Sequence, residues 1–529
     1  MKSVRLQNLR CLRDTGTIAL KPLTVLVGRN SSGKSTFLRF FPLMKQTIEA
    51  GSREPVLWYS PRYVDYGSFQ ESLSFGSRTG LMAFEFGLDL RILDTRLRGR
   101  WQFLRELGQS EEVPWQISWT FPRAETPRRQ SRCIVKTTIS GEQFRGVSLR
   151  VDGHVVNWDI ADEGIVTLSL NGQKFENFRT LTESSQAPGY LPQIVSSDGK
   201  SCADYFIGQL LGILRKVSHK GTKPRTLLQF ALRIPFGRAS MMLSQMKTRE
   251  LTAKKLKEKI EGLALEDPIA ADLINLTVGS YVDVMISSIN QYLSSYFASV
   301  RYIAPVRASA ERYYRLQGLP IDEIDPRGEN LAMALHYMNP AEVARFDEWV
   351  QEHFQFRIDS RVSGGHTYMG ISTDRETSVN LADSGFGYSQ LLPIILSMWR
   401  SVYSDTTRRM NRGPRESKVI TFAIEQPELH LHPALQGLLI DAFVSLVMDR
   451  EHRDVRMIIE THSETILNRI GYLISKRVSN LRPKDVSVLI FDGTSDGAVV
   501  VRKSGYDDQG YLRSWPLGFF TPAGVDRGN

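Results

Sequence analysis

Cysteine is scarce in this chain of 529 residues, which contains only Cys11, Cys133 and Cys202. None of them falls in a CxxC or similar metal-binding spacing, so the sequence offers no zinc site and no disulfide framework and indicates a reduced, cytoplasmic protein. Long apolar runs are lacking too. Residues 1–20 have no signal-type segment, and no stretch reaches the ~18 apolar residues that a membrane span requires. We therefore expect a soluble protein without a membrane partner.

Charge of one sign is in modest excess, with 67 Lys and Arg against 57 Asp and Glu. The net charge of +10 favours polyanionic partners, but it does not separate nucleic acid from acidic protein. Two basic stretches, at residues 215–225 and 408–415, could bind phosphate backbones without sequence preference, although a solvated surface is the commoner explanation. The sequence thus leaves nucleic acid as a candidate partner.

The hydrophobic pattern changes twice along the chain. Apolar, β-branched segments before Gly28 predict strands, and the segment that follows has helical spacing. Between about residues 80 and 175, short alternating segments with Asp152-Gly153 and Asn171-Gly172 turns predict antiparallel hairpins. Helical spacing then dominates to about residue 300, and α/β character returns after it.

This pattern predicts an α/β fold in which a head is assembled from both ends of the chain. We expect residues 1–200 to form the N-terminal half of the head with its β insertion, and residues 301–529 to form the C-terminal half. Residues 201–300 between them are expected to form a helical arm or lid.

The strongest motif runs from Gly28 to Ser35 and fits GxxxxGK[ST] between a predicted strand and a predicted helix, which is the context of a P-loop. Glycines let successive N–H groups converge on phosphate oxygens at a helix N-terminus. Lys34 should reach the β and γ phosphates, and the Ser35 hydroxyl should complete a Mg²⁺ shell. We expect ATP and Mg²⁺ as cofactors. The predicted nucleotide-binding residues here are Asn30, Ser31, Ser32, Gly33, Lys34, Ser35 and Thr36.

The second motif, at residues 418–433, is an apolar strand that ends in acidic residues, the form of a Walker B element. Glu425 could hold Mg²⁺ or its water shell, and the next acidic position could orient the attacking water. A core strand that ends in surface acids is the alternative.

Two weaker motifs flank this strand. Residues 384–390 place glycines before a predicted helix, where free backbone amides could hold a phosphate presented by another subunit, although such a sequence is often only a turn. Residues 457–464 form a strand that ends at His462, whose neutral imidazole could hydrogen-bond a γ phosphate or could be structural.

The order of these motifs resembles the ABC ATPase superfamily, and within it the branch that holds the SMC, RecF and OLD ATPases. The resemblance covers both ends of the chain, at residues 4–10 and 425–433. It implies an ABC-type P-loop head that dimerises on ATP, with His462 as the switch histidine and Gln70 as a Q-loop metal ligand. It also implies signature residues that contact nucleotide across the dimer interface, namely Ser384, Gly385 and Gly387.

Three further segments, at residues 303–307, 325–330 and 515–520, are similar to the PtuA-type ATPases of Septu and retron-linked antiphage defence systems. This likeness implies an antiviral complex in which a homodimer or higher homo-oligomer controls a separate HNH nuclease. In retron-linked forms a reverse transcriptase with its RNA–DNA product would join it. The alternative is a RecF- or SMC-like repair or maintenance clamp that binds DNA directly.

Two departures from the ABC pattern limit what the resemblance implies. Gln426 stands where ABC ATPases usually place a catalytic glutamate, and an amide can orient water but cannot accept its proton. Hydrolysis is then slow, and either Glu428 supplies the base or the dimer stays ATP-bound for long periods. OLD nucleases carry a Toprim domain after the switch histidine, but here the pair Asp492 and Asp496 flanks a predicted hairpin turn. We find no nuclease site in the sequence.

Overall fold

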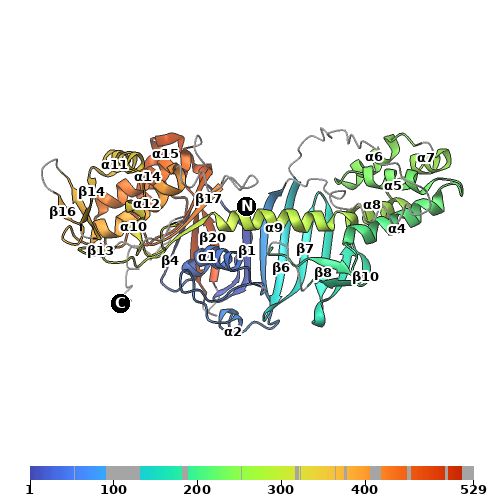
Figure 1. Ribbon diagram of the computed structural model, residues 1–529, viewed down its shortest axis with the longest axis horizontal. Coiled ribbons are helices and arrows are strands. Elements are labelled where there is room, and N and C mark those ends of the chain that lie inside the picture. The colour runs from blue at the N-terminus through green and yellow to red at the C-terminus, as the bar shows by residue number, and fades with distance from the viewer. Residues whose placement is uncertain are drawn as a thin grey trace, which may run out of the picture. The chain divides into compact units, whose positions relative to one another are not determined.

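The computed structural model divides into two compact units, drawn in Figure 1. The first unit comprises Met1–Val4, Arg53–Pro55 and Leu81–Ser294, and the second comprises Arg5–Ser52, Val56–Gly80 and Ser295–Asn529. The structure describes residues 1–52, 54–90, 131–181, 189–251, 253–315, 321, 323–363, 365–373, 378–404, 419–449, 454–494 and 499–514.

An antiparallel sheet dominates the first unit, as the hairpin signals predict. Its strands follow one another in chain order, from β5 to β11. Two-residue turns at Asp152-Gly153 and Asn171-Gly172 have positive φ at both positions, which is the geometry that twisted hairpins need. The strands are β5 Met82–Leu90, β6 Ser131–Ser140, β7 Gln143–Val151, β8 His154–Ile160, β9 Ile165–Leu170, β10 Gln173–Thr180 and β11 Ile194–Ser196.

Helices follow the sheet in the chain, also as predicted. They are α4 Cys202–Val217, α5 Pro224–Arg233, α6 Ala239–Thr248, α7 Lys254–Glu261, α8 Pro268–Ser280 and α9 Val282–Ala298, and the 3₁₀ turn η1 Asp162–Gly164 lies in the sheet. Helix α8 contacts both α4 and strand β9. The helical segment therefore shares one compact unit with the β insertion, whereas the sequence had suggested a boundary between them near residue 200.

The second unit is built on a six-stranded sheet in the order β12-β17-β18-β4-β19-β20. All neighbouring pairs are parallel except β19 and β20. This sheet confirms the predicted α/β class, with both chain ends contributing strands. Its strands are β4 Leu23–Gly28, β12 Val300–Ile303, β17 Val419–Glu425, β18 Asp454–Glu460, β19 Val486–Gly493 and β20 Val499–Ser504.

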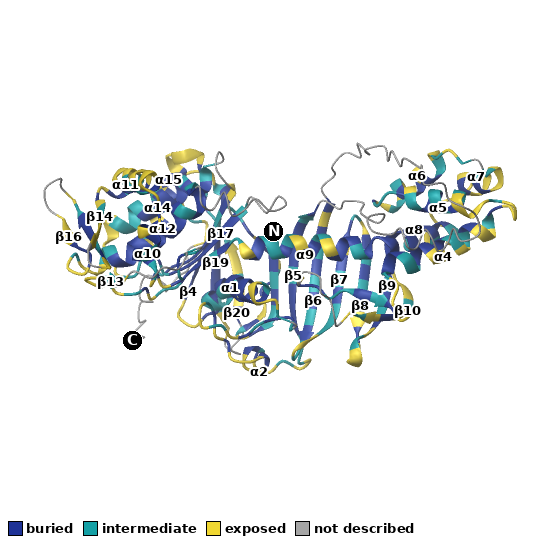
Figure 2. Ribbon diagram, in the orientation of Figure 1, coloured by how far each residue is buried: buried dark blue, intermediate teal, exposed yellow. Residues whose placement is uncertain are grey.

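Helices cover both faces of this parallel sheet, so its central strands are buried (Figure 2). Alternate residues of β4, including Val25 and Val27, join one apolar core with α12, α14 and α15. Helix α1 contacts β4, β17 and β18, and its phenylalanines are buried outside that core. The helices are α1 Lys34–Ala50, α10 Leu331–His336, α11 Pro340–Phe354, α12 Phe386–Tyr403, α14 Pro433–Met448 and α15 Glu464–Ser475.

Smaller elements complete the second unit. They are the strands β1 Ser3–Leu9, β2 Leu12–Asp14, β3 Ile18–Ala19, β13 Tyr314–Arg315, β14 Arg357–Ser363, β15 His366–Ser372 and β16 Val379–Asn380, the helix α2 Phe69–Ser72, and the 3₁₀ turns η2 Val478–Asn480 and η3 Pro483–Asp485. The first residues of β1 belong to the first unit.

Within the described part of the chain, no single helix is long and apolar enough to cross a membrane. Helices α8 and α9 meet the length and composition limits only as a pair, and this pair is bent by 42°.

Candidate functional site

The P-loop turns between β4, which ends at Gly28, and α1, which begins at Lys34. Gly28 has φ +148°, and a Cβ there would lie 2.3 Å from the carbonyl oxygen of Phe491. Gly33 has φ +91°, and its Cβ would lie 2.9 Å from Cys11 Sγ. Because these contacts are shorter than real Cβ atoms tolerate, only glycine lets the loop pass so close to its neighbours.

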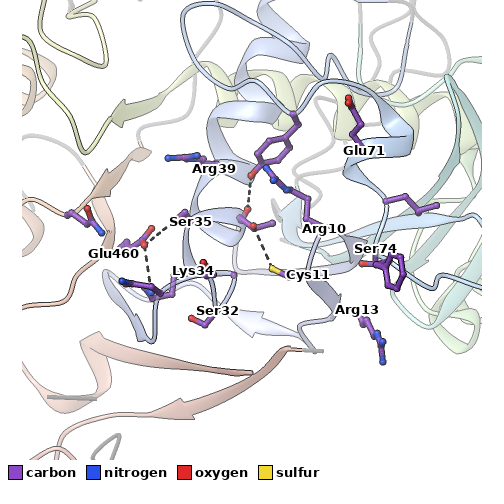
Figure 3. A pocket seen from close by; sticks show the side chains of 18 of the residues that line it. Arg10, Cys11, Arg13, Ser32, Lys34, Ser35, Arg39, Glu71, Ser74 and Glu460 are labelled. Carbon is purple, nitrogen blue, oxygen red and sulfur yellow. Dashed lines mark hydrogen bonds and ion pairs between the residues drawn. The ribbon is translucent and has the colours of Figure 1, made fainter. Parts of the chain in front are cut away.

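A cavity of about 710 Å³ opens beside this loop in the second unit (Figure 3). All of the predicted P-loop residues 30–36 line it, and so do Gln426 and His462 from the ends of the sheet strands. Arg10, Arg13 and Arg39 add positive charge to its wall. Its volume and its excess of cationic groups suit a nucleotide with several phosphates.

Lys34 is nearly covered, with 3% of its side chain exposed. Its Nζ donates to the carbonyl oxygens of Gly28, at 2.9 Å, and Arg29, at 2.7 Å. Burial lowers the pKa of Lys34, while the nearby Glu460 carboxylate opposes that shift. The hydroxyl of Ser32 is buried and has no hydrogen-bond partner among the described residues. The Lys34 ammonium and the Ser32 hydroxyl are thus hydrogen-bond donors at the P-loop, which in this motif binds phosphate.

The acid that accepts a hydrogen bond from Ser35 is Glu460, at the end of β18, and not the predicted Glu425, at the end of β17. Ser35 Oγ donates to Glu460 Oε1 at 2.8 Å, and Lys34 Nζ lies 4.0 Å from the same oxygen (Figure 3). Burial, and then the charge of Glu425, raise the pKa of Glu460 to about 7. Glu460 was not predicted as a site residue. The signal was present, since Glu460 is an acid at the end of a buried strand just as Glu425 is.

Glu425, the predicted Mg²⁺ residue, makes other contacts. Its carboxylate accepts a two-point hydrogen bond from Arg39, at 2.6 and 2.8 Å, and a third bond from the Tyr302 hydroxyl at 2.7 Å. Its side chain is 3% exposed. Burial and the charge of Glu425 raise the pKa of Tyr302 well above its ordinary value, so the phenol remains a donor. Glu425 thus belongs to a buried ion pair in this structure.

The loop after β17 is bonded to the switch segment. Gln426 has φ +42°, and its backbone N–H donates to the Glu460 carbonyl at 2.8 Å. Glu428 Oε1 accepts the His462 backbone N–H at 2.7 Å, and burial raises the pKa of Glu428. Burial also lowers the pKa of the His462 imidazole, with the Lys34 charge adding to the shift. Gln426 and His462 both line the cavity.

Arg307 binds the backbone of the loop that follows β17. Only 4% of it is exposed, and its Nη2 donates to the carbonyl oxygens of Glu425, at 3.2 Å, and Gln426, at 3.4 Å. Burial lowers the pKa of Arg307 to about 10. Arg307 was not predicted as a site residue, because nothing local distinguishes it from a surface arginine.

The signature-like turn precedes α12. Gly385 has φ +85° at the helix N-cap, and Ser384 Oγ donates to the Leu381 carbonyl at 2.8 Å. Neither these residues nor Gly387 is among those that line the P-loop cavity of the same chain. Their contact with nucleotide across a dimer therefore stays a prediction.

Gln70, the predicted Q-loop ligand, is exposed on α2 and is not among the described residues that line the cavity. Its neighbours Tyr66 and Glu71 do line it. Residues 408–415, 515–520 and Asp496, on which some predictions fall, lie outside the described residues, whereas Asp492 pairs with Arg502 across the β19–β20 hairpin.

The residues at the P-loop fit a magnesium ion that arrives with phosphates. No group of three or more His, Cys, Asp or Glu that could hold a metal ion occurs among the described residues. Mg²⁺ needs no such cage, since it keeps several waters and takes one or two protein ligands plus phosphate oxygens. The Ser35 hydroxyl and a strand-end carboxylate provide that kind of donor set.

One comparison with known protein families matches the region of the site. Residues 1–64 and 322–467 match the family described as AAA ATPase domain, and these segments contain the P-loop, the signature-like turn, the Walker B strand and His462. No curated protein matches the chain.

The chain also has distant likenesses to solved SMC heads. The Smc head domain of Pyrococcus furiosus, bound to the C-terminal domain of ScpA, is 9% identical, with 95% of each chain covered and a TM-score of 0.31. The SMC head domain of Thermotoga maritima is 9% identical, with 95% of this chain and 97% of that chain covered and a TM-score of 0.32. The Smc head domain with a coiled coil and joint of Pyrococcus yayanosii is 10% identical, with 96% and 97% covered and a TM-score of 0.33. These scores are too low to carry function or partners to this chain.

The fold and the site together define the class of the protein. A P-loop joins β4 to α1. His462 follows β18, the strand next to β4, and Gln426 follows β17, which lies one strand further away. The family match covers the same elements. The second unit therefore has the α/β fold of a P-loop nucleotide-binding domain, in the region where the chain matches the AAA ATPase domain family.

Proposed function

We propose that this chain binds ATP with Mg²⁺ in the P-loop cavity and hydrolyses it slowly. One observation carries the proposal: residues 30–36, Gln426 and His462, which are distant in sequence, line one cationic cavity. Lys34 would contact the β and γ phosphates, and Ser35 with a strand-end acid would hold Mg²⁺. The bound ion would neutralise charge that develops on the phosphates.

The side chains at the γ-phosphate end favour slow turnover. Gln426 can orient a water molecule but has no basic oxygen that would accept its proton. One carboxylate oxygen of Glu428 accepts a hydrogen bond from the His462 backbone N–H. Glu428 is not among the described residues that line the cavity. Glu428 could act as the general base only if its hydrogen bond to the His462 backbone N–H were broken. A long-lived ATP state follows more directly from this arrangement than rapid cycling.

ATP binding in such a head would be completed by a second copy. The amides at the N-terminus of α12, freed by Gly385 and Gly387, have the direction and partial charge that suit a phosphate. They belong to the second unit but not to the described lining of its cavity. A homodimer with two shared nucleotides accounts for both facts.

The biological setting rests on the motif resemblance alone. We place the ATPase in a cytoplasmic antiviral complex, where its ATP state controls a separate HNH nuclease, with a reverse transcriptase and RNA–DNA product in retron-linked forms. Purification of the tagged protein from its host at low salt with ATP tests this. Recovery of a small HNH protein supports it, and recovery of bulk chromosomal DNA with recombination proteins alone supports a repair clamp.

Single-turnover hydrolysis of ATP tests the enzymatic proposal. Wild-type turnover should be slow, Gln426→Glu should accelerate it, and Glu428→Gln should have little effect. Fast wild-type turnover that Glu428→Gln abolishes would instead make Glu428 the base. Ser384→Arg should prevent ATP-dependent dimerisation in light scattering without loss of nucleotide binding, and Ser475→Arg, at an exposed end of α15, should not.

A further inference from the structure

The two strand-end acids of the nucleotide site differ in how far they lie from the P-loop. Strand β18 pairs directly with β4, with Glu460 in register with Leu26, whereas β17 lies one strand further away, with Glu425 in register with Glu460. Neighbouring strands are about 4.8 Å apart, so the Glu425 backbone is about 10 Å from the P-loop strand and the Glu460 backbone about half that.

The two acids also differ in how their oxygens are used. Both oxygens of Glu425 accept hydrogen bonds from Arg39, and Tyr302 adds another. Glu460 has one oxygen on the Ser35 hydroxyl, while its other oxygen, Oε2, is buried without a partner among the described residues. A buried carboxylate oxygen that makes no bond within the described residues is available to a ligand.

Glu460 also has the exposure and the neighbours of a ligand. Its side chain is 4% exposed, it lines the cavity, and it lies beside the two P-loop side chains that act on phosphate and metal, Lys34 and Ser35. Glu425 is not among the described residues that line the cavity. A carboxylate aimed at the P-loop serine is the oxygen donor that Mg²⁺ prefers.

We propose that Glu460, at the end of β18, is the acid of the magnesium site, and that Glu425 is a positioning residue that Arg39 and Tyr302 hold in an ion pair. The assignment rests on the proposed function, because the ion arrives with ATP. Glu460 would hold Mg²⁺ or its water shell together with Ser35, while the Arg39–Glu425 pair fixes the end of β17 and the loop that presents Gln426.

The test is the Mg²⁺ dependence of binding of a fluorescent ATP analogue to the full chain, measured for wild type, Glu460→Gln, Glu425→Gln and Glu71→Gln. Glu71 lines the same cavity, so its variant removes one negative charge there and controls for general electrostatics. Each protein is titrated with MgCl₂ at fixed analogue and measured again in EDTA. Thermal unfolding without nucleotide is recorded in parallel.

We expect Glu460→Gln to raise the half-saturating Mg²⁺ concentration at least tenfold, with binding in EDTA unchanged within twofold. Without nucleotide it should unfold at the wild-type temperature or above, since it removes a buried, partly unbonded charge. Glu425→Gln should unfold at a lower temperature and, like Glu71→Gln, keep the wild-type Mg²⁺ dependence within threefold.

A tenfold change in Glu425→Gln with none in Glu460→Gln would overturn the assignment, and so would equal changes in both. These outcomes leave the proposed function intact, because wild type still binds ATP. If the wild-type chain binds no analogue with or without Mg²⁺, the proposed function fails and the assignment fails with it.

Discussion

Loss of Arg39 should destabilise the head through Glu425. The Arg39 guanidinium meets the carboxylate at 2.6 and 2.8 Å, and the Glu425 side chain is 3% exposed. Two unit charges about 4 Å apart attract by about 4 kcal/mol at an effective dielectric constant of about 20. Because 35% of the Arg39 side chain is exposed, we halve this to a coupling of about 2 kcal/mol. Arg39→Met alone should cost about 3 kcal/mol, since among the described residues it leaves the buried Glu425 carboxylate with Tyr302 as its side-chain hydrogen-bond donor.

A double-mutant cycle measures this coupling. Arg39→Met, Glu425→Gln and the double variant are unfolded in urea, and the transition that belongs to the head is identified as the one that ATP shifts. The double variant should be less destabilised than the sum of the single variants by about 2 kcal/mol. A coupling below about 0.5 kcal/mol would refute the assignment of Glu425 to a buried ion pair.

Three further results are expected. Gly28→Ala should abolish ATP binding and lower the unfolding temperature, because its Cβ would lie 2.3 Å from the Phe491 carbonyl oxygen. The control Gly437→Ala, on α14 with no atom within 4 Å of its Cβ, should leave ATP binding unchanged and keep or slightly raise the unfolding temperature. Equal behaviour of the two variants would contradict the loop geometry. Cys11 lines the cavity, so it should be alkylated quickly and ATP should protect it, as measured by mass spectrometry. Burial raises the pKa of Cys133 to about 12, so Cys133 should react only on unfolding. A Cys11 that ATP does not protect would mean that ATP binds elsewhere. Asn290→Ala should cost about 2 kcal/mol in thermal unfolding, since it removes buried hydrogen bonds to both Leu191 backbone groups, and a loss under 0.5 kcal/mol would count against that contact.

The sequence was most informative where structure is local. The P-loop is defined by glycines whose backbone no other residue adopts easily, so eight consecutive letters predicted its conformation and its place before α1. Two of the hairpins of the first unit, β7–β8 and β9–β10, follow from Asp-Gly and Asn-Gly for the same reason. Such signals need no knowledge of what the chain packs against.

The roles of the strand-end acids were beyond the sequence because they depend on strand order. Glu425 and Glu460 both end apolar strands, and nothing local tells which strand lies next to the P-loop strand. Arg39 looks like an ordinary helix residue, yet α1 carries it to the end of β17. Partners distant in sequence decide which acid remains available to the P-loop.

The helix at residues 69–72 is a case where a readable signal was not used. Ser68 and Glu71 form a capping box, a pattern visible in the sequence. The box predicts a helix start with Gln70 in its first turn, where its side chain is exposed. That the sheet and the helices after residue 200 share one compact unit, by contrast, could not be predicted, since the packing of α8 on β9 is a tertiary contact.

The proposed function depends on ATP binding at this P-loop. Calorimetric titration of wild type and Lys34→Met with ATP and Mg²⁺ tests it most directly, with circular dichroism to confirm that both proteins fold. We expect one ATP per chain for wild type and at least a tenfold loss of affinity for Lys34→Met, because Lys34 Nζ lies at the carbonyls of the loop that would surround the phosphates. Equal affinity of the two proteins, or no heat of binding for wild type, would contradict it.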